Sequence, residues 1–213
     1  LLVLAEAPDA DLPMRLAVQA QRIRAELGPL LIDLVPGWTT LLLHYDLLQT
    51  DHLSLSARLT PLLEVWLAEP SPALAGRLHE WPVWYAGEDL AEVAQTCGLS
   101  VAEVIALHSA VEYRVGAIGF APGFAYLGEL DSRLQLPRRA TPRTQVPAGS
   151  LAIAERQTAV YPQASPGGWH LLGRCPLPLF DPRQTPPSPL AIGDRVRFYS
   201  IDEAAYRALG GPL

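Results

Sequence analysis

The stretch QTAVYPQASPGGWHLLGRCP, residues 157–176, contains two short apolar segments on either side of a Pro-Gly-Gly sequence. The first segment ends at Tyr161 and the second begins at Trp169, and both have the length of strands rather than of helices. Two consecutive glycines give more backbone freedom than a single hairpin turn requires. The stretch therefore predicts a strand–loop–strand unit. Its loop is either a plain connection or a place where the backbone approaches a ligand between Tyr161 and Trp169.

Similar short apolar segments recur through the rest of the second half of the chain. Proline and glycine separate them, and many of the 21 prolines lie between residues 122 and 189. Short strands at such intervals indicate a closed or nearly closed β-barrel, and rigid loops above a barrel commonly carry function. The predicted strands are WPVWY (81–85), YRVGAIGF (113–120), SLAIA (150–154), TAVYP (158–162), WHLLGR (169–174) and DRVRFYS (194–200).

Two consecutive helices are predicted between the first two of these strands. The first covers residues 88–98 and ends at Gly98, because glycine commonly follows the last turn of a helix. The second begins at Ser100, and Glu103 three residues later completes a capping box. This second helix extends to Ala110 or slightly beyond.

The first third of the chain has a different pattern. Residues 12–27 place apolar side chains at spacings of four and three, which indicates one face of a helix. Segments 30–37 and 39–45 are typical of antiparallel strands. Residues 53–68 predict a second helix, with Pro61 either in its first turn or at a kink.

The stretch 69–78 is rich in proline and alanine, has little periodicity and predicts a linker. We therefore expect an α+β chain of two domains. A small N-terminal α/β domain covers residues 1–78, and a β-barrel domain covers residues 79–213.

Composition argues against several classes of function. The formal net charge of −6 argues against a nucleic-acid partner, because phosphate backbones are bound by clustered Lys and Arg. No apolar run approaches the length of a membrane span, so we expect no membrane association and a cytoplasmic protein. Cys97 and Cys175 lack CxxC spacing and the histidines form no HxxxH or HExxH pattern, so we expect no metal. The chain also has no Walker A, GxGxxG or GxSxG motif.

The segment GFAPGFAYLG (119–128) combines Phe120, Phe124 and Tyr126 with three glycines and a proline. It follows neither the helical nor the strand period. Either the loop packs into the core, or it forms an apolar pocket wall in which glycine brings backbone N–H groups to a ligand.

The segment LPRRATPRTQVPAGS (136–150) concentrates Arg138, Arg139 and Arg143 in a loop restricted by proline. A rigidly held guanidinium is suited to bidentate capture of a carboxylate or phosphate. Ordinary solvated charges, paired with acidic residues such as Asp131, explain the pattern equally well.

His108 and Glu112 are four residues apart, so they share one face if the second of the paired helices extends that far. A carboxylate beside an imidazole can form an acid/base pair. The same spacing is also an ordinary stabilising pair on a helix surface.

Five segments of the chain resemble, in order and spacing, the B-type subunits of bacterial 5-oxoprolinases, a family also called KipI or allophanate hydrolase subunit 1. The match is close over the C-terminal two thirds and holds only in pattern before that. The segments that resemble this family are HSAVEY, GFAPGFAYLG, PRRATPRTQVPAGS, QTAVYPQASPGGWHLLGR and LFDP.

The resemblance implies a small α+β domain, here beginning after its first strand, followed by a cyclophilin-like β-barrel. It also implies two protein partners, the KipA-like C-type and the A-type subunits of 5-oxoprolinase. The expected activity is the ATP-dependent opening of a cyclic amide, 5-oxo-L-proline, to L-glutamate, with the chain inactive alone. ATP is used by the complex, and the sequence shows no cofactor site of its own.

A groove edged by the Pro-Gly-Gly-Trp loop is the substrate site that this resemblance implies. Arg143 is assigned to the substrate carboxylate, Gln157 and glycine N–H groups to the lactam carbonyl, and the aromatic residues to the ring. The candidate substrate-binding residues are Arg143, Gln157, Tyr161, Gly167, Gly168, Trp169, Phe120, Phe124 and Tyr126, and the candidate catalytic residues are His108 and Glu112.

Three other functions stay open at this point. One branch of the family inhibits a sensor histidine kinase. Related paired domains form carboxyltransferase halves that act on an amide such as urea or allophanate. Prolyl isomerisation follows only from the implied barrel, and a fold does not carry its function with it.

Overall fold

The computed structural model describes residues 1–7, 11–68 and 76–212, which form two compact units, Leu1–Gly76 and Arg77–Leu213. Most of the linker expected over 69–78 lies outside the described residues. The second unit includes Arg77, because the backbone N–H of Arg195 donates to its carbonyl oxygen at 2.8 Å.

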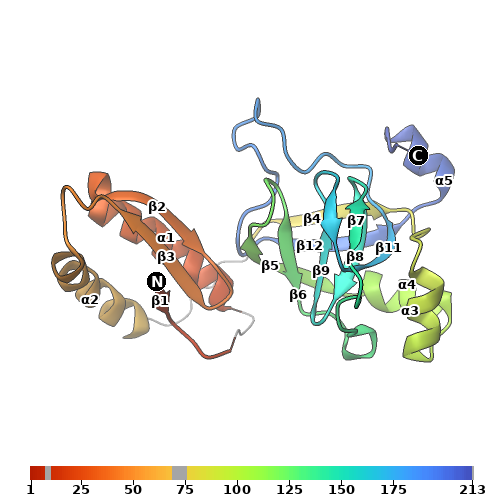
Figure 1. Cartoon of the computed structure of the whole chain (residues 1–213), viewed down its shortest axis with the longest axis horizontal. Coiled ribbons are helices and arrows are strands. Elements are labelled where there is room, and N and C mark those ends of the chain that lie inside the picture. Colours follow the sequence, from red (N-terminus) through yellow and green to blue (C-terminus); the bar gives the residue numbers. More distant parts are fainter. Residues whose placement is uncertain (8–10, 69–75, 213) are drawn as a thin grey trace. The chain divides into compact units, whose positions relative to one another are not determined.

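The N-terminal unit is a three-stranded antiparallel sheet with two helices (Figure 1). Its strand order is β1-β3-β2, and the apolar face of α1 packs on the sheet through Leu16, Ala20 and Ile23. The helix expected over 12–27 is confirmed, whereas Pro61 lies inside α2 rather than in its first turn. The elements are β1 (Leu2–Val3), α1 (Leu12–Leu27), η1 (Gly28–Leu30), β2 (Leu31–Pro36), β3 (Thr40–Tyr45) and α2 (His52–Ala68).

The C-terminal unit is built around a seven-stranded sheet with the order β11-β8-β9-β6-β5-β12-β4. Its strands are β4 (Leu78–Val83), β5 (Glu112–Ile118), β6 (Ala125–Gly128), β8 (Ser150–Ala154), β9 (Gln157–Val160), β11 (His170–Arg174) and β12 (Arg195–Ser200). The two ends of the sheet meet, since Trp84 and Arg174 exchange two backbone hydrogen bonds of 2.9 Å. The expected α+β class with a nearly closed barrel is thereby confirmed.

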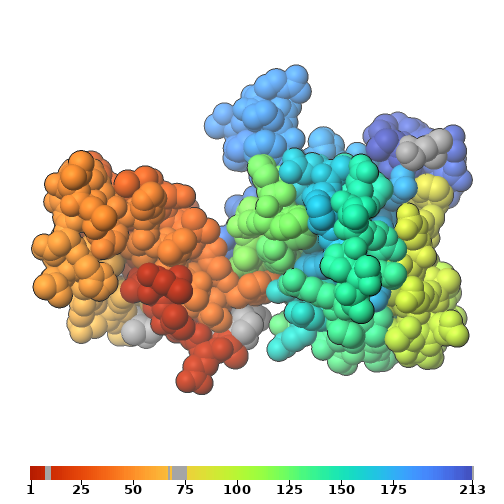
Figure 2. Space-filling view, in the orientation of Figure 1, coloured from red at the N-terminus to blue at the C-terminus, as the bar shows by residue number. Residues whose placement is uncertain are grey.

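Smaller elements complete this unit and surround the barrel. A separate two-stranded sheet pairs β7 with β10, and α3 and α4 lie together beside the barrel (Figure 1). The connection between β11 and β12 stands out from the surface in Figures 1 and 2. The elements are α3 (Leu90–Cys97), α4 (Val101–Ser109), η2 (Ser132–Leu134), β7 (Arg143–Val146), β10 (Ser165–Gly167) and α5 (Glu203–Ala208).

Local sequence signals explain the two paired helices. The capping box of Ser100 and Glu103 is present at the start of α4, and Gly98 ends α3 with a left-handed φ of 68°. Within the described residues no single helix is long and apolar enough to cross a membrane, although α3 and α4 together, bent by 94°, reach that length and composition.

Strands β8 and β9 contribute to two apolar clusters because side chains alternate across a strand. Leu151 and Ile153 join the main core inside the barrel. Ala152 and Ala154 face a second, smaller cluster that also contains aromatic residues of the expected site. This second cluster is the floor of the site described next.

Candidate functional site

A groove of about 220 Å³ lies over the second apolar cluster. Five aromatic side chains line it, and the Pro-Gly-Gly segment and Pro142 form part of its edge. Two of the expected substrate-binding residues, Arg143 and Gln157, do not line this groove. The structure brings the other seven together there, namely Phe120, Phe124, Tyr126, Tyr161, Gly167, Gly168 and Trp169.

Phe124 is the centre of the aromatic floor. Its ring meets Phe120, Tyr126 and Tyr161 edge to face, with centroid distances of 5.1, 4.8 and 5.3 Å. Edge-to-face pairs of this kind are the preferred arrangement of aromatic rings. The floor is therefore held in a fixed geometry before any ligand arrives.

Phe120 is the unusual member of this set. Its side chain is exposed, and its backbone has a φ of 72°, which is strained for a bulky residue. Strain of this kind is retained where the surrounding structure requires it, often at binding sites. Phe120 therefore offers an aromatic surface at the edge of the groove.

The glycines of the Pro-Gly-Gly segment have a different role from the one that turn chemistry suggests. Gly167 belongs to strand β10, and neither Gly167 nor Gly168 has a positive φ. A Cβ atom on Gly167 would lie 2.3 Å from the hydroxyl oxygen of Tyr161, whereas one on Gly168 would make ordinary contacts of 3.6 Å with Pro142. Gly167 is needed for close packing against Tyr161, and the loop is part of the groove wall rather than a plain hairpin.

Arg143 is held by acidic side chains instead of facing the groove. Its Nη2 donates to Asp89 Oδ1 at 2.7 Å and lies 3.4 Å from Glu88 Oε2. Arg139 donates from Nη1 to the same Asp89 oxygen at 2.9 Å and to Glu92 at 3.2 Å. The prediction that Arg143 is available to a substrate carboxylate is not supported by this geometry.

Asp89 is the residue that the sequence interpretation missed. It stands directly before α3, yet its side chain makes no capping bond. Its carboxylate, only 4% exposed, accepts from both arginines and from the Leu171 N–H at 2.7 Å. Burial raises the pKa of the Asp89 carboxyl, but the hydrogen bonds from Arg143 and Leu171 and the charges of both arginines outweigh it, so the pKa is lowered.

Arg138 provides the exposed positive charge at the groove, whereas Arg139, which also lines it, is bound to Asp89 and Glu92. Arg138 lines the groove, is 59% exposed, and forms a long ion pair of 3.6 Å with the exposed Glu155. Burial raises the pKa of the Tyr126 and Tyr161 hydroxyls, and the charge of Arg138 opposes this rise at both. Its guanidinium is thus within electrostatic range of two groove residues.

Gln157 lies away from the groove. It begins β9 and pairs with Ala154 at the β8–β9 turn. Alternation along the strand puts it on the same face as Tyr161, but four residues of extended chain separate the two by roughly 13 Å. The structure does not bring it to the other candidate substrate-binding residues.

His108 and Glu112 do not form a pair. Helix α4 ends at Ser109 and Glu112 begins β5, where its carboxylate bonds Arg195 and Arg197. His108 is fully buried in the barrel core. The shared helix face that their spacing suggested is therefore absent.

Both ring nitrogens of His108 have partners in the core. Thr158 donates its hydroxyl hydrogen to the Ala152 carbonyl, so its oxygen accepts from His108 Nε2 at 2.9 Å. His108 Nδ1 then accepts from the Tyr85 hydroxyl at 2.8 Å. Burial lowers the pKa of His108 to about 3, so the ring is neutral near pH 7 and links three parts of the barrel.

The sequence of the chain matches one family model and several relatives that share one name. The family model described as carboxyltransferase domain, subdomain C and D, matches residues 1–190. The chain is 42% identical over 191 residues to the B subunit of 5-oxoprolinase from Bacillus subtilis (strain 168), which covers 84% of this chain and 80% of that protein. It is 47% identical over 175 residues to the protein of the same name from Escherichia coli O157:H7, with 80% and 78% covered.

Solved structures are similar in fold. The crystal structure of TTHA0988 has a TM-score of 0.81 and 40% identity, and covers 94% of this chain. This chain spans only 39% of the length of that one. The conserved uncharacterized protein PH0987 from Pyrococcus horikoshii has a TM-score of 0.60 and 39% identity, with 95% and 94% of the two chains covered. The urea carboxylase of Kluyveromyces lactis, at 16% identity and a TM-score of 0.75, shares the fold alone.

Proposed function

This chain belongs to the family of B-type 5-oxoprolinase subunits, and on that premise we propose that it is the B component of an ATP-dependent 5-oxoprolinase. In this proposal it acts in the cytoplasm with an A-type partner and a KipA-like C-type partner, and it is inactive alone. The complex opens 5-oxo-L-proline to L-glutamate and uses ATP as co-substrate.

The observation that carries the proposal is an aromatic groove with a single well-exposed arginine at its side. 5-Oxoproline is a flat lactam ring that carries a carboxylate. Phe120, which is exposed, and Tyr126, which is partly exposed, offer ring surfaces, and Arg138 offers a guanidinium whose ion pair with Glu155 is long and exposed. We assign the carboxylate to Arg138 in place of Arg143, whose guanidinium is bound to Asp89.

The groove is suited to binding and orienting a lactam rather than to activating water. Burial raises the pKa of Tyr126 and Tyr161, so both phenols keep their protons near neutral pH, and among the described residues the other hydrogen-bonding side chains of the groove are the guanidinium groups of Arg138 and Arg139. These groups can donate hydrogen bonds to a carbonyl oxygen, but none of them is a general base. In the proposal, a partner protein supplies the base and ATP activates the amide.

The test is glutamate formation from 5-oxoproline and ATP by the chain alone and by the chain co-expressed with its A-type and C-type partners. Activity is expected only in the complete mixture. Arg138→Ala should raise the KM for 5-oxoproline about tenfold or more, since a hydrogen bond to a charged group contributes roughly 1.5–3 kcal/mol. Arg156→Ala is the matched control, because Arg156 is an exposed arginine paired with Glu129 and outside the groove.

An assembled mixture without activity would contradict the proposed reaction, and an unchanged KM in Arg138→Ala would contradict the assignment of the carboxylate. In the first case the alternatives are inhibition of a sensor histidine kinase and a carboxyltransferase half acting on urea or allophanate. Measuring kinase autophosphorylation with the same purified chain separates these two.

A further inference from the structure

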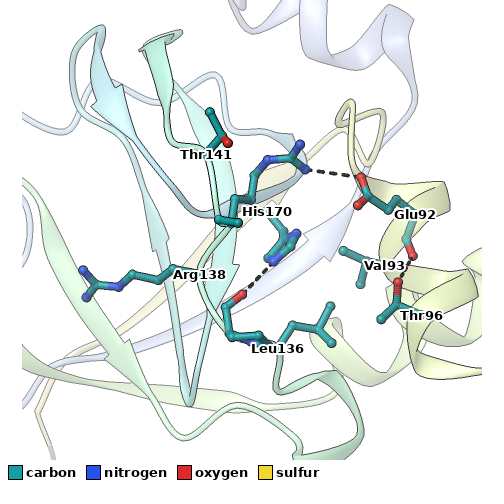
Figure 3. Close-up of a pocket in the computed structure, with 10 residues that line it drawn as sticks. Glu92, Val93, Thr96, Leu136, Arg138, Thr141 and His170 are labelled. Carbon is teal, nitrogen blue, oxygen red and sulfur yellow. Dashed lines mark hydrogen bonds and ion pairs between the residues drawn. The ribbon is translucent and has the colours of Figure 1, made fainter.

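A second hollow, of about 470 Å³, lies on the other side of the arginine-rich segment. Helix α3 forms one wall through Glu92, Val93 and Thr96, and residues 136–141 form another (Figure 3). Arg138 and Arg139 border both hollows, and Figure 3 shows the Arg138 side chain pointing away from Glu92. The volume is within the range of about 300–1,000 Å³ that is typical of ligand pockets.

Arg139 gives this hollow an unused donor. Its Nη1 donates hydrogen bonds to both Asp89 and Glu92, while its Nε is buried and has no hydrogen-bond partner among the described residues. A guanidinium binds carboxylates through two parallel N–H groups on one edge. The edge of Arg139 that contains Nε is therefore suited to a ligand carboxylate, which reaches the buried Nε once the side chains that cover it shift.

His170 and Glu92 give the hollow its acceptors. His170 Nε2 lies 2.9 Å from the Pro137 carbonyl oxygen, and because a carbonyl only accepts, Nε2 carries the hydrogen. In the neutral ring Nδ1 is then an acceptor, and it too is buried without a partner in the described part of the chain, so a ligand reaches it once the neighbouring side chains shift. The Glu92 carboxylate is 60% exposed and lines the same hollow, so a ligand cation has two acceptors.

We propose that this hollow binds a free α-amino acid. The ligand carboxylate lies on Arg139, its ammonium lies between Glu92 and His170 Nδ1, and its short aliphatic part contacts Val93 and Leu136. The charges distinguish this ligand from 5-oxoproline, whose nitrogen is acylated and carries no ammonium. The inference rests on the chemistry of this hollow and does not depend on the proposed function.

The experiment is calorimetric titration of the purified full chain with L-alanine and L-glutamate, and with N-acetyl-L-alanine, L-alaninamide and 5-oxoproline as probes. At least one free amino acid is expected to bind. Acetylation of the nitrogen or amidation of the carboxylate should weaken binding by about tenfold or more, since each removes one charged contact.

Glu92→Gln should weaken amino-acid binding by about tenfold. Glu88→Gln is the matched control: Glu88 is 65% exposed and pairs with Arg143, but it does not line the hollow. Arg156→Ala should also leave amino-acid binding unchanged, because Arg156 is exposed, pairs with Glu129 and lines neither hollow. The proposal is overturned if neither amino acid binds at tens of millimolar, if Glu92→Gln binds as tightly as the wild type, or if the acetylated probe equals the free amino acid.

Discussion

Replacing Asp89 by Asn tests whether one buried carboxylate organises both arginines. Asn keeps an oxygen for one donor but loses the charge that Arg139 and Arg143 share. Removing one member of a buried ion pair costs about 3–5 kcal/mol. Because Arg139 and Arg143 are 28% and 19% exposed and retain Glu92 and Glu88, we expect a smaller loss of unfolding free energy, about 2–3 kcal/mol.

The assay is urea unfolding, with amide hydrogen exchange at Leu171 as a local reporter, since its N–H donates to Asp89 Oδ2. The Asp89 pKa lies below its ordinary value of 3.8, so its stabilisation is fully present above that value and is lost as the pH falls through the lower folded pKa. The difference in unfolding free energy between the wild type and Asp89→Asn should therefore stay constant around neutral pH. A loss below about 1 kcal/mol, or unchanged exchange at Leu171, would refute the central role of Asp89.

Two further substitutions probe the core and the loop. The pKa of His108 is about 3, below its ordinary 6.5, so the unfolded chain takes up the proton first and stability falls as the pH drops from 6.5 towards 3. This loss of unfolding free energy, about 1.4 kcal/mol per pH unit when measured by urea unfolding, should disappear in His108→Gln and persist in the control His52→Gln. Equal slopes of unfolding free energy against pH in the two variants would contradict the prediction. Gly167→Ala should lower the unfolding free energy by about 1–3 kcal/mol because its Cβ meets the buried Tyr161, whereas Gly168→Ala should change it by less than about 0.5 kcal/mol. Similar losses in the two variants would show that the close packing is not specific to Gly167.

Local patterns in the sequence predict the elements well because local chemistry forms them. The spacing of Leu16, Ala20 and Ile23 indicates the face that α1 buries, and the Ser100–Glu103 capping box marks the start of α4. Pairing between distant strands is different. Strands β4 and β12 run parallel with Leu78 opposite Arg195, and no pattern within either strand specifies that partner.

The site was only partly predictable for the same reason. The aromatic residues were identified because an irregular loop rich in them is visible in the sequence. Asp89 was missed because its partners lie about fifty residues further along the chain, and the barrel alone brings them together. The expected pairing of His108 with Glu112 was wrong, because a spacing of four residues does not reveal that α4 ends at Ser109 and that the ring is buried in the core.

Arg138 and Arg139 show how two adjacent residues come to serve two hollows. The backbone N–H of Arg139 donates to the Gly168 carbonyl at 2.8 Å, and its guanidinium is held by Asp89. The backbone and the guanidinium of Arg139 are thereby both fixed, and the guanidinium also contacts Glu92 of α3. Arg138 lacks such an anchor, since its ion pair with Glu155 is long and exposed, and Figure 3 shows its side chain pointing away from Glu92. Asp89, which lines neither hollow, thus holds the guanidinium of Arg139 in place and leaves that of Arg138 exposed.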